Sequence, residues 1–259
     1  MWYPWAYYGY TPDNVEYNAD GTITINNNNG ASTGANTALA TATPTGGVSP
    51  LFSKGVGFGG GAYFECICRW SPVYVGSVTK WPSFWALPIE QDNSVAPYSL
   101  DWPGQAAGYR HSLEWDFMEY DGGLSTEYGI AMHDYHGPTG SVVTVNATGI
   151  SPAIPSGSPD FSQFHKYGAL WIPATSTPGS GTAKQFFDDV QIGSTVNWDQ
   201  NTDATGGVPP VTGAQVCSII DKLHLFLILG NGSQGKQAMQ FVVKEVNVWQ
   251  VSDANNIHA

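Results

Sequence analysis

"HSLEWDFMEYDG", residues 111–122, places three acidic side chains within six positions of an otherwise aromatic and apolar run. In a regular β-strand Glu114 and Asp116 share one face, while Glu119 lies on the other. Carboxylates are rarely buried without a partner, because removing their charge from water is costly. An extra residue bulged out between Asp116 and Glu119 would return Glu119 to the face of Glu114, as bulges near active sites do. The stretch therefore predicts a bulged strand with three acids on one face and Trp115 buried beneath it.

The rest of the chain alternates short β patterns with turn-rich segments, and no helical periodicity is long enough to predict a helix. Asp188–Asp189 and Asn231–Gly232 are predicted to be turns. No segment has the composition of a linker, so we expect residues 1–259 to form one all-β domain, a two-sheet β-sandwich. The predicted strands are 22–26, 62–69, 81–87, 112–120, 127–134, 141–146, 166–172, 184–188, 222–229 and 240–251.

The charge balance excludes several classes of partner. Twenty-one acids face nine Lys plus Arg, for a formal net charge of −12, and no basic cluster is present. Without a basic cluster the chain has no surface that could bind the phosphates of a nucleic-acid backbone, so we expect no nucleic-acid partner. A densely sulfated polysaccharide is disfavoured for the same reason. Neutral ligands suit a chain with 10 Trp and 13 Tyr.

The cysteines and the ends of the chain give further expectations. Cys66, Cys68 and Cys217 form no disulfide framework and no metal-binding spacing, so we expect buried free thiols. No run of eighteen apolar residues predicts a membrane span. The start "MWYPWAYYGY" lacks the basic and apolar regions of a signal peptide. The protein is then either cytosolic or a mature secreted chain that carries an added Met1, and the function implied by the resemblance described below favours the second.

Two interpretations of the acidic stretch remain open from the residues alone. Glu114 and Glu119 would act as a pair if their long side chains bring the carboxyls to the roughly 5–5.5 Å that retaining glycosidases use. Asp116 between them would then raise the pKa of the neighbour that holds a proton, because adjacent carboxylates resist joint ionisation. Alternatively, the acids form a solvated or purely structural cluster.

"LEWDFMEYDG" resembles the catalytic signature of glycoside hydrolase family 16, the family of laminarinases, lichenases and agarases. The E-x-D-x-x-E motif of the family's bulged subgroup is matched by Glu114, Asp116 and Glu119. The resemblance implies that Glu114 is the nucleophile, Glu119 the acid/base and Asp116 an assisting residue. Further segments resemble family strands in the same order: "GGGAYFECICRW" (59–70), "KWPSFWALP" (80–88), "YGIAMHDY" (128–135), "FHKYGALWIP" (164–173) and "FVVKEVNVWQ" (241–250).

This resemblance implies a jelly-roll sandwich with a concave substrate cleft. It also implies a retaining endo-glycosidase that cleaves β-1,3- or mixed β-1,3/1,4-glucan, working as a monomer without a cofactor. Alternatives are an agarase or galactanase, a transglycosylase, and a non-catalytic lectin-like sandwich that binds sugars. The family commonly has a calcium-binding Asp where this chain has Lys244, so we expect no calcium there.

Aromatic and polar residues near the motif are candidate substrate contacts. Trp81 and Trp85 share one face of a strand while Phe84 faces the other way, and indole rings stack on sugars as readily as they fill a core. His133 follows the acidic strand by one hairpin, which predicts a position beside Glu114. His136 lies three positions later and faces the opposite way, so we reject a zinc site and expect no metal.

The long segment 89–111 precedes the acidic strand and is a candidate wall of the substrate site. Trp102, Tyr109 and Arg110 lie in it. The aromatic rings are candidate sugar contacts, although they can also fold back onto the sandwich. Arg110 is either a substrate contact or a counter-charge to the nearby acids.

Overall fold

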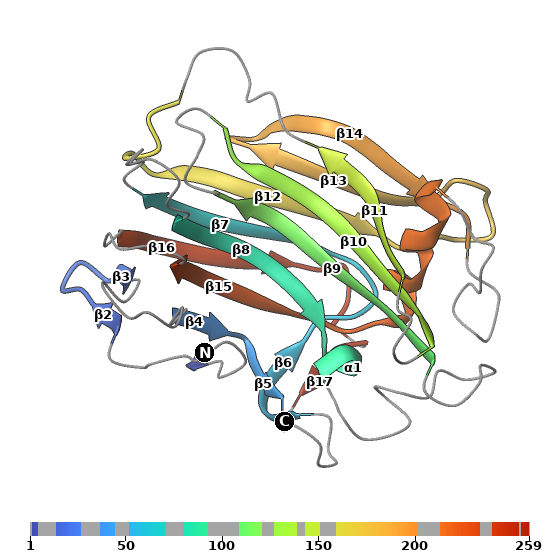
Figure 1. The fold of residues 1–259 in the computed structure, drawn as a ribbon, viewed down its shortest axis with the longest axis horizontal. Helices are drawn as coiled ribbons and strands as arrows, with labels where there is room; N and C mark the ends of the chain where they lie inside the picture. The colour runs from blue at the N-terminus through green and yellow to red at the C-terminus, as the bar shows by residue number, and fades with distance from the viewer. Residues whose placement is uncertain are drawn as a thin grey trace.

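Two antiparallel β-sheets stack face to face in the computed structural model (Figure 1). The structure describes residues 2–4, 14–26, 37–44, 52–70, 80–92, 109–120, 127–138, 143–150, 159–200, 213–233, 240–253 and 255–258. Sheet 1 has the strand order β1 (Tyr3–Pro4), β4 (Thr37–Ala40), β15 (Leu225–Ser233), β8 (Lys80–Pro88), β9 (Tyr109–Glu119), β10 (Gly129–Pro138) and β11 (Val143–Ile150). Sheet 2 has the order β14 (Val190–Trp198), β13 (Gly181–Phe187), β12 (His165–Ile172), β7 (Ala62–Trp70), β16 (Gln240–Trp249), β3 (Ile23–Asn26) and β2 (Val15–Tyr17).

Smaller elements complete the described part of the chain. Three short strands form a third sheet, in the order β17 (Ile257–His258), β6 (Phe52–Gly57) and β5 (Ala42–Pro44). A four-residue helix, α1 (Ile89–Asp92), follows β8, and a 3₁₀ helix, η2 (Gly213–Lys222), precedes β15. No helix in these residues is long and apolar enough to span a membrane.

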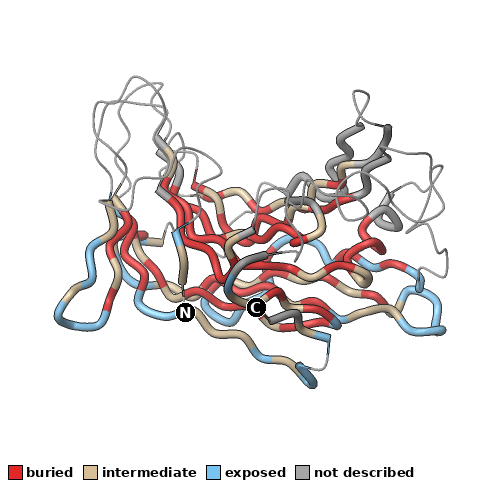
Figure 2. The backbone as a smooth tube through the Cα atoms, turned by 90° about the horizontal axis from the view of Figure 1, so that it is seen from below, coloured by how far each residue is buried: buried red, intermediate tan, exposed pale blue. Residues whose placement is uncertain are grey.

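Aromatic rings fill the space between the two sheets. The ring of Phe117 on β9 lies 5.5 Å from that of Phe64 on β7, in a stacked geometry. It also meets Phe84 at 4.9 Å and Trp115 at 5.0 Å, both edge to face. Full burial of one such ring stabilises the folded state by about 1.5–3 kcal/mol. Figure 2 shows these buried residues concentrated along the middle of the strands, with exposed residues at the hairpin turns.

The sequence-based expectations of an all-β fold and of two sheets are confirmed. Every segment predicted to be a strand overlaps one of the strands β3, β7–β13, β15 and β16, with boundaries that differ by a few residues. The strands β1, β2, β4, β5, β6, β14 and β17 were not predicted. β4 reads "TALA" and has only small side chains around one leucine, while β14 is a sheet edge with only three buried positions. Cys66, Cys68 and Cys217 are buried free thiols, as expected.

The prediction of a turn at Asn231–Gly232 is wrong, because both residues belong to β15. The side chain of Asn231 is fully buried, and its Nδ2 donates to the carbonyl oxygen of Ile25 at 2.7 Å. Ile25 belongs to β3 of sheet 2, so this hydrogen bond joins the two sheets. A buried amide is favourable only when it is hydrogen-bonded, and the partner lies far away in sequence.

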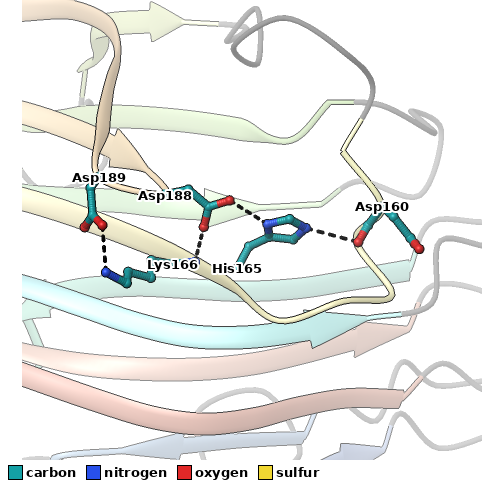
Figure 3. Close-up of polar contacts among 5 residues, drawn as sticks. All are labelled: Asp160, His165, Lys166, Asp188 and Asp189. Carbon is teal, nitrogen blue, oxygen red and sulfur yellow. Dashed lines mark hydrogen bonds and ion pairs between the residues drawn. The ribbon is translucent and has the colours of Figure 1, made fainter.

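The predicted turn at Asp188–Asp189 is confirmed, with φ angles of 45° and 68°. This hairpin between β13 and β14 is held to β12 by a polar network (Figure 3). Asp188 accepts hydrogen bonds from His165 Nδ1 at 2.7 Å and from the Lys166 main-chain nitrogen at 2.9 Å, and Asp189 pairs with Lys166 Nζ at 2.7 Å. His165 Nε2 also lies 3.1 Å from the carbonyl oxygen of Asp160. We therefore assign His165 a structural role.

Candidate active site

The strand β9 contains the predicted bulge. On one side, β8 pairs Phe84 with Met118 and the next residue, Trp85, with Asp116. On the other side, β10 pairs Gly129 with Glu119 and Ala131 with Asp116. The β8 ladder therefore skips Phe117. In the β10 ladder, Phe117 and Met118 together lie opposite the single residue Ile130, so β9 has one extra residue relative to both neighbours.

The bulge sets which face each side chain of β9 takes. Trp115, Phe117 and Met118 all belong to the core between the sheets. Directly opposed residues of an antiparallel pair share a face. Glu119 lies opposite Ser83, and Asp116 lies opposite Trp85. The three acids of the motif therefore occupy the outer face of sheet 1, the face turned away from sheet 2.

Asp116 lies at the centre of the acidic group. Its side chain is fully buried, and its Oδ2 atom lies 3.1 Å from Nε2 of His133 on β10. His133 pairs with Glu114 across the β9–β10 ladder, as the predicted position beside Glu114 requires. Donor atoms of Glu114, Asp116 and His133 all lie within 4.8 Å of one another. Two carboxyls and one imidazole thus share a single small site.

Burial and mutual repulsion make this site hold a proton. The pKa of Glu114 is raised to about 7, first by burial and second by the neighbouring charge of Asp116. His133 and a hydrogen bond from Tyr135 act in the opposite sense on the Glu114 pKa. Burial also raises the pKa of Asp116, against the contact with His133. Glu114 therefore exchanges its proton near neutral pH, which is the range useful for acid–base chemistry.

The same three groups have the donor types of a divalent-cation site. A carboxylate–carboxylate–imidazole set suits several transition metals. A bound cation would hold both carboxyls ionised, and it would compete with the contact between His133 and Asp116. The same geometry also suits a site in which the two carboxyls share a proton.

Trp85 is half-buried on the outer face of sheet 1. It packs beside a second apolar cluster, made by Ala38, Ala40, Ala42, Leu87, Ile89, Phe226 and Ile228. Gly230 on β15 leaves room for the side chain of Ser83, because a Cβ atom at this position would lie 2.6 Å from Ser83 Oγ. Phe84 is fully buried in the core, so the predicted division of faces on β8 is confirmed.

The remaining predicted contacts are only partly described. Trp81 lies in β8, and Tyr109 and Arg110 begin β9, but their side chains are outside the described part of the structure. Trp102 lies outside the described residues altogether.

Two site residues were missed by the sequence-based prediction. Tyr135 lies two positions after His133 on the same strand face, so strand parity alone would have found it. Ser83 lies on the outer face of β8 opposite Glu119, two positions before Trp85, and the same parity applies.

No protein-family model and no curated protein matches the chain, whereas solved structures match over nearly all of it. An endo-β-1,3-glucanase from Pyrococcus furiosus is 19% identical, with a TM-score of 0.56 over 95% of this chain and 80% of that one. LamA from Zobellia galactanivorans, in complex with laminaritriose and laminaritetraose, is 17% identical, with a TM-score of 0.55 over 96% and 92% of the two chains. An endo-acting O-glycanase of the human gut microbiota is 13% identical, with a TM-score of 0.58 over 96% and 91%. The chain therefore has the jelly-roll fold of the laminarinases and endo-β-1,3-glucanases.

Proposed function

We propose that the chain is a secreted, monomeric member of glycoside hydrolase family 16, with one catalytic domain over residues 1–259. Its activity is the retaining endo-hydrolysis of β-1,3- or mixed β-1,3/1,4-glucan. The observation that carries the proposal is the bulge at Phe117, which turns Glu114, Asp116 and Glu119 to one face of sheet 1. If the same sequence formed a regular strand without the bulge, Glu119 would point away from the other two acids.

The proposed mechanism uses the two glutamates in turn. Glu114 attacks the anomeric carbon as a carboxylate, while Glu119 protonates the leaving glycosidic oxygen. Glu119 then removes a proton from the water that releases the glycosyl-enzyme. Asp116 and His133 hold the local charge so that Glu114 loses its proton near neutral pH, and Tyr135 donates a hydrogen bond that favours the carboxylate.

Substrate binding would involve the outer face of sheet 1 around these acids, which would form the floor of a concave cleft. Trp85 is half-buried beside Asp116, so part of its indole face is available to stack on a sugar ring. Trp81 has the same strand parity as Trp85 in β8, which favours a neighbouring subsite. His133 is partly exposed and can reach a sugar hydroxyl. Trp102, Tyr109 and Arg110 remain proposed contacts.

A second candidate is hydrolysis of a galactose-containing glycan by the same two glutamates. This alternative is supported by the equally good fold match to an endo-acting O-glycanase that initiates mucin breakdown. Transfer to a second sugar and binding without cleavage use the same face. Only cleavage or transfer needs Glu114 and Glu119 together.

Reducing-end release tests the proposal. The purified chain and the Glu114→Gln and Glu119→Gln variants are assayed on laminarin, barley β-glucan, agarose, xyloglucan and mucin. Glu245→Gln is the matched control, because Glu245 is an exposed acid of sheet 2. We expect one glucan to be cleaved by the wild type and the control and by neither site variant. NMR of the first product must show the β-anomer, and an α-anomer would contradict the retaining mechanism. Cleavage of mucin or agarose alone would select the second candidate, and a folded wild type that cleaves none of the five would refute hydrolysis of these glycans.

A further inference from the structure

Gln185 is a polar side chain on the core-facing side of β13. Its neighbours Ala183 and Phe187 on the same face are core residues, and Gln185 itself is only 7% exposed. In the ladders of sheet 2 it lies between Ala169 on β12 and Ile192 on β14, both of which are buried. An amide in such surroundings is unfavourable unless it has a hydrogen-bond partner.

The partner of Gln185 lies in the opposite sheet. Its Nε2 donates to the main-chain carbonyl oxygen of Asp116 at 3.2 Å, and the two residues are 69 positions apart in the chain. A carbonyl in a regular ladder points along the sheet to the next strand. The Asp116 carbonyl instead accepts from across the core. It belongs to the peptide that joins Asp116 to Phe117, where the bulge begins.

The hydrogen bond does not make Gln185 a good core residue. Its Oε1 atom is buried and has no hydrogen-bond partner in the described part of the chain. A buried amide with one satisfied end and one unsatisfied end contributes little net stability, and an apolar side chain of similar volume is often equally good or better. Stability therefore does not explain this choice of residue, whereas support of a neighbouring functional site does.

We propose that Gln185 is a positioning residue that anchors the bulge of β9 and thereby aligns the acids on either side of it. The peptide that it holds carries Asp116 directly, and Asp116 in turn contacts His133. The same peptide sets the course of the chain toward Glu119, three residues further on. Catalytic groups must be held to within a fraction of an ångström, so a loosened bulge slows the chemical step. The kinetic part of this inference rests on the proposed hydrolysis.

Gln185→Met tests the proposal, because it keeps the length and volume of the side chain and removes the donor. We expect kcat on the cleaved glucan to fall by about ten- to a hundredfold with KM nearly unchanged, and the melting temperature to be equal or higher. Gln191→Met is the matched control, since Gln191 is an exposed glutamine of the adjoining strand β14. An unchanged kcat in Gln185→Met would overturn the proposal, and so would a lowered melting temperature without a loss of kcat.

Gln185→Glu separates positioning from core filling. A protonated glutamic acid can donate to the Asp116 carbonyl, whereas the ionised form cannot and repels it. We expect this variant to approach wild-type kcat at low pH and to lose activity as the pH rises, in a range where the wild type remains active. The same loss at every pH would overturn the proposal. Failure of both variants to fold would assign Gln185 to stability and would also overturn it.

Amide hydrogen exchange provides a readout that does not depend on activity. Exchange of the peptide covering residues 113–120 is compared by mass spectrometry in the wild type, Gln185→Met and Gln191→Met. Faster exchange in Gln185→Met alone supports anchoring of the bulge, even if the wild type cleaves no glycan and the proposed function fails. Unchanged exchange, together with an active wild type, would overturn the anchoring and leave the proposed function intact.

Discussion

His133 lies opposite Glu114 in the β9–β10 ladder, yet its Nε2 atom contacts Oδ2 of Asp116 at 3.1 Å. One imidazole therefore acts on two carboxyls, by direct contact with one and through its charge on the other. The raised pKa of Glu114 is the balance of burial and the Asp116 charge against His133 and Tyr135. Substitution of a group that raises the pKa of Glu114 and substitution of a group that lowers it should therefore have opposite effects on the pH dependence of activity.

Asp116→Asn removes a charge that raises the pKa of Glu114. Because the nucleophile must be ionised, the acid limb of the kcat/KM profile reports the pKa of Glu114. This pKa is about 7 in the unliganded wild type. We expect this limb to move to lower pH in Asp116→Asn, together with a fall in kcat. Hydrolysis measured from pH 4 to pH 9 checks the shift.

His133→Gln is the opposing control in the same assay. The charge of His133 lowers the pKa of Glu114, and the substitution removes this charge. The acid limb is therefore expected to move to higher pH. Limbs that move in the same direction in both variants would contradict this account of the site.

Glu114→Gln should stabilise the fold at neutral and alkaline pH. The pKa of Glu114 is about 7 in the folded chain, against an ordinary value of 4.5. Between these values the folded state keeps a proton that the unfolded state has lost, so stability falls as the pH rises from about 4.5 to 7. The Gln variant has no such penalty. We expect a free energy of unfolding higher by on the order of 1–3 kcal/mol at pH 8, with no difference at pH 4.

Urea unfolding at these two pH values checks this prediction. Glu245→Gln, the exposed control of sheet 2, should match the wild type at both. A Glu114→Gln variant that is less stable than the wild type at pH 8 would show that the carboxylate is favourably paired in the folded state.

Chelation should leave activity and melting temperature unchanged. Glu114, Asp116 and His133 have the donor types of a cation site, but the proposed mechanism needs a carboxyl that gains and loses a proton there. We expect hydrolysis after exhaustive EDTA treatment to equal that of untreated protein, with no gain on addition of Ca²⁺, Mg²⁺, Mn²⁺ or Zn²⁺. Loss of activity that one of these ions restores would replace proton sharing by metal binding.

Asp221→Asn should destabilise the fold without a specific effect on catalysis. The Asp221 carboxylate accepts hydrogen bonds from the indole nitrogens of Trp171 and Trp198 at 2.9 and 2.8 Å, and from the main-chain nitrogen of Ala174 at 3.0 Å. These bonds tie η2 to sheet 2. An amide offers only one acceptor atom, so at least one buried donor loses its partner, at a cost of about 1–3 kcal/mol.

The melting temperature of Asp221→Asn is expected to fall by several degrees, with kcat retained at 25 °C. Asp199→Asn is the control, because Asp199 is an exposed aspartate whose carboxylate accepts from the main-chain nitrogen of Gly179. An Asp221→Asn variant as stable as the control would show that the hydrogen bonds of Asp221 between η2 and sheet 2 do not stabilise the fold.

The bulge could be predicted because its reason is chemical and local. Three carboxylates in an apolar run have little use on opposite faces, and the residues between them are too hydrophobic for an exposed edge. The faces of Trp85 and Phe84 followed from alternation alone. Tyr135 was within reach of the same argument.

Other features depend on partners that the local sequence does not name. Asn231 has the composition of a turn with Gly232, but its buried amide finds the Ile25 carbonyl in the other sheet. Gln185 lies in a short β pattern whose polarity suggests an outward-facing residue, and its partner is 69 positions away. The strand β4 is only four residues long and has buried Ala38, Leu39 and Ala40 in succession, and the edge strand β14 has only three buried positions, so neither produces an alternating signal. In each case tertiary contacts override a weak local preference.

Phe117 is the one extra residue in an otherwise regular strand. If it were deleted, Asp116, Met118 and Glu119 would alternate without interruption, and both acids would still occupy the outer face of sheet 1. The deletion would instead remove the aromatic contacts that Phe117 makes in the core. It would also displace the Asp116 carbonyl that accepts the hydrogen bond from Gln185. Deletion of one codon would therefore convert the bulged strand of this chain into a straight one with both acids on the same face, provided that Gln185 in sheet 2 is replaced as well.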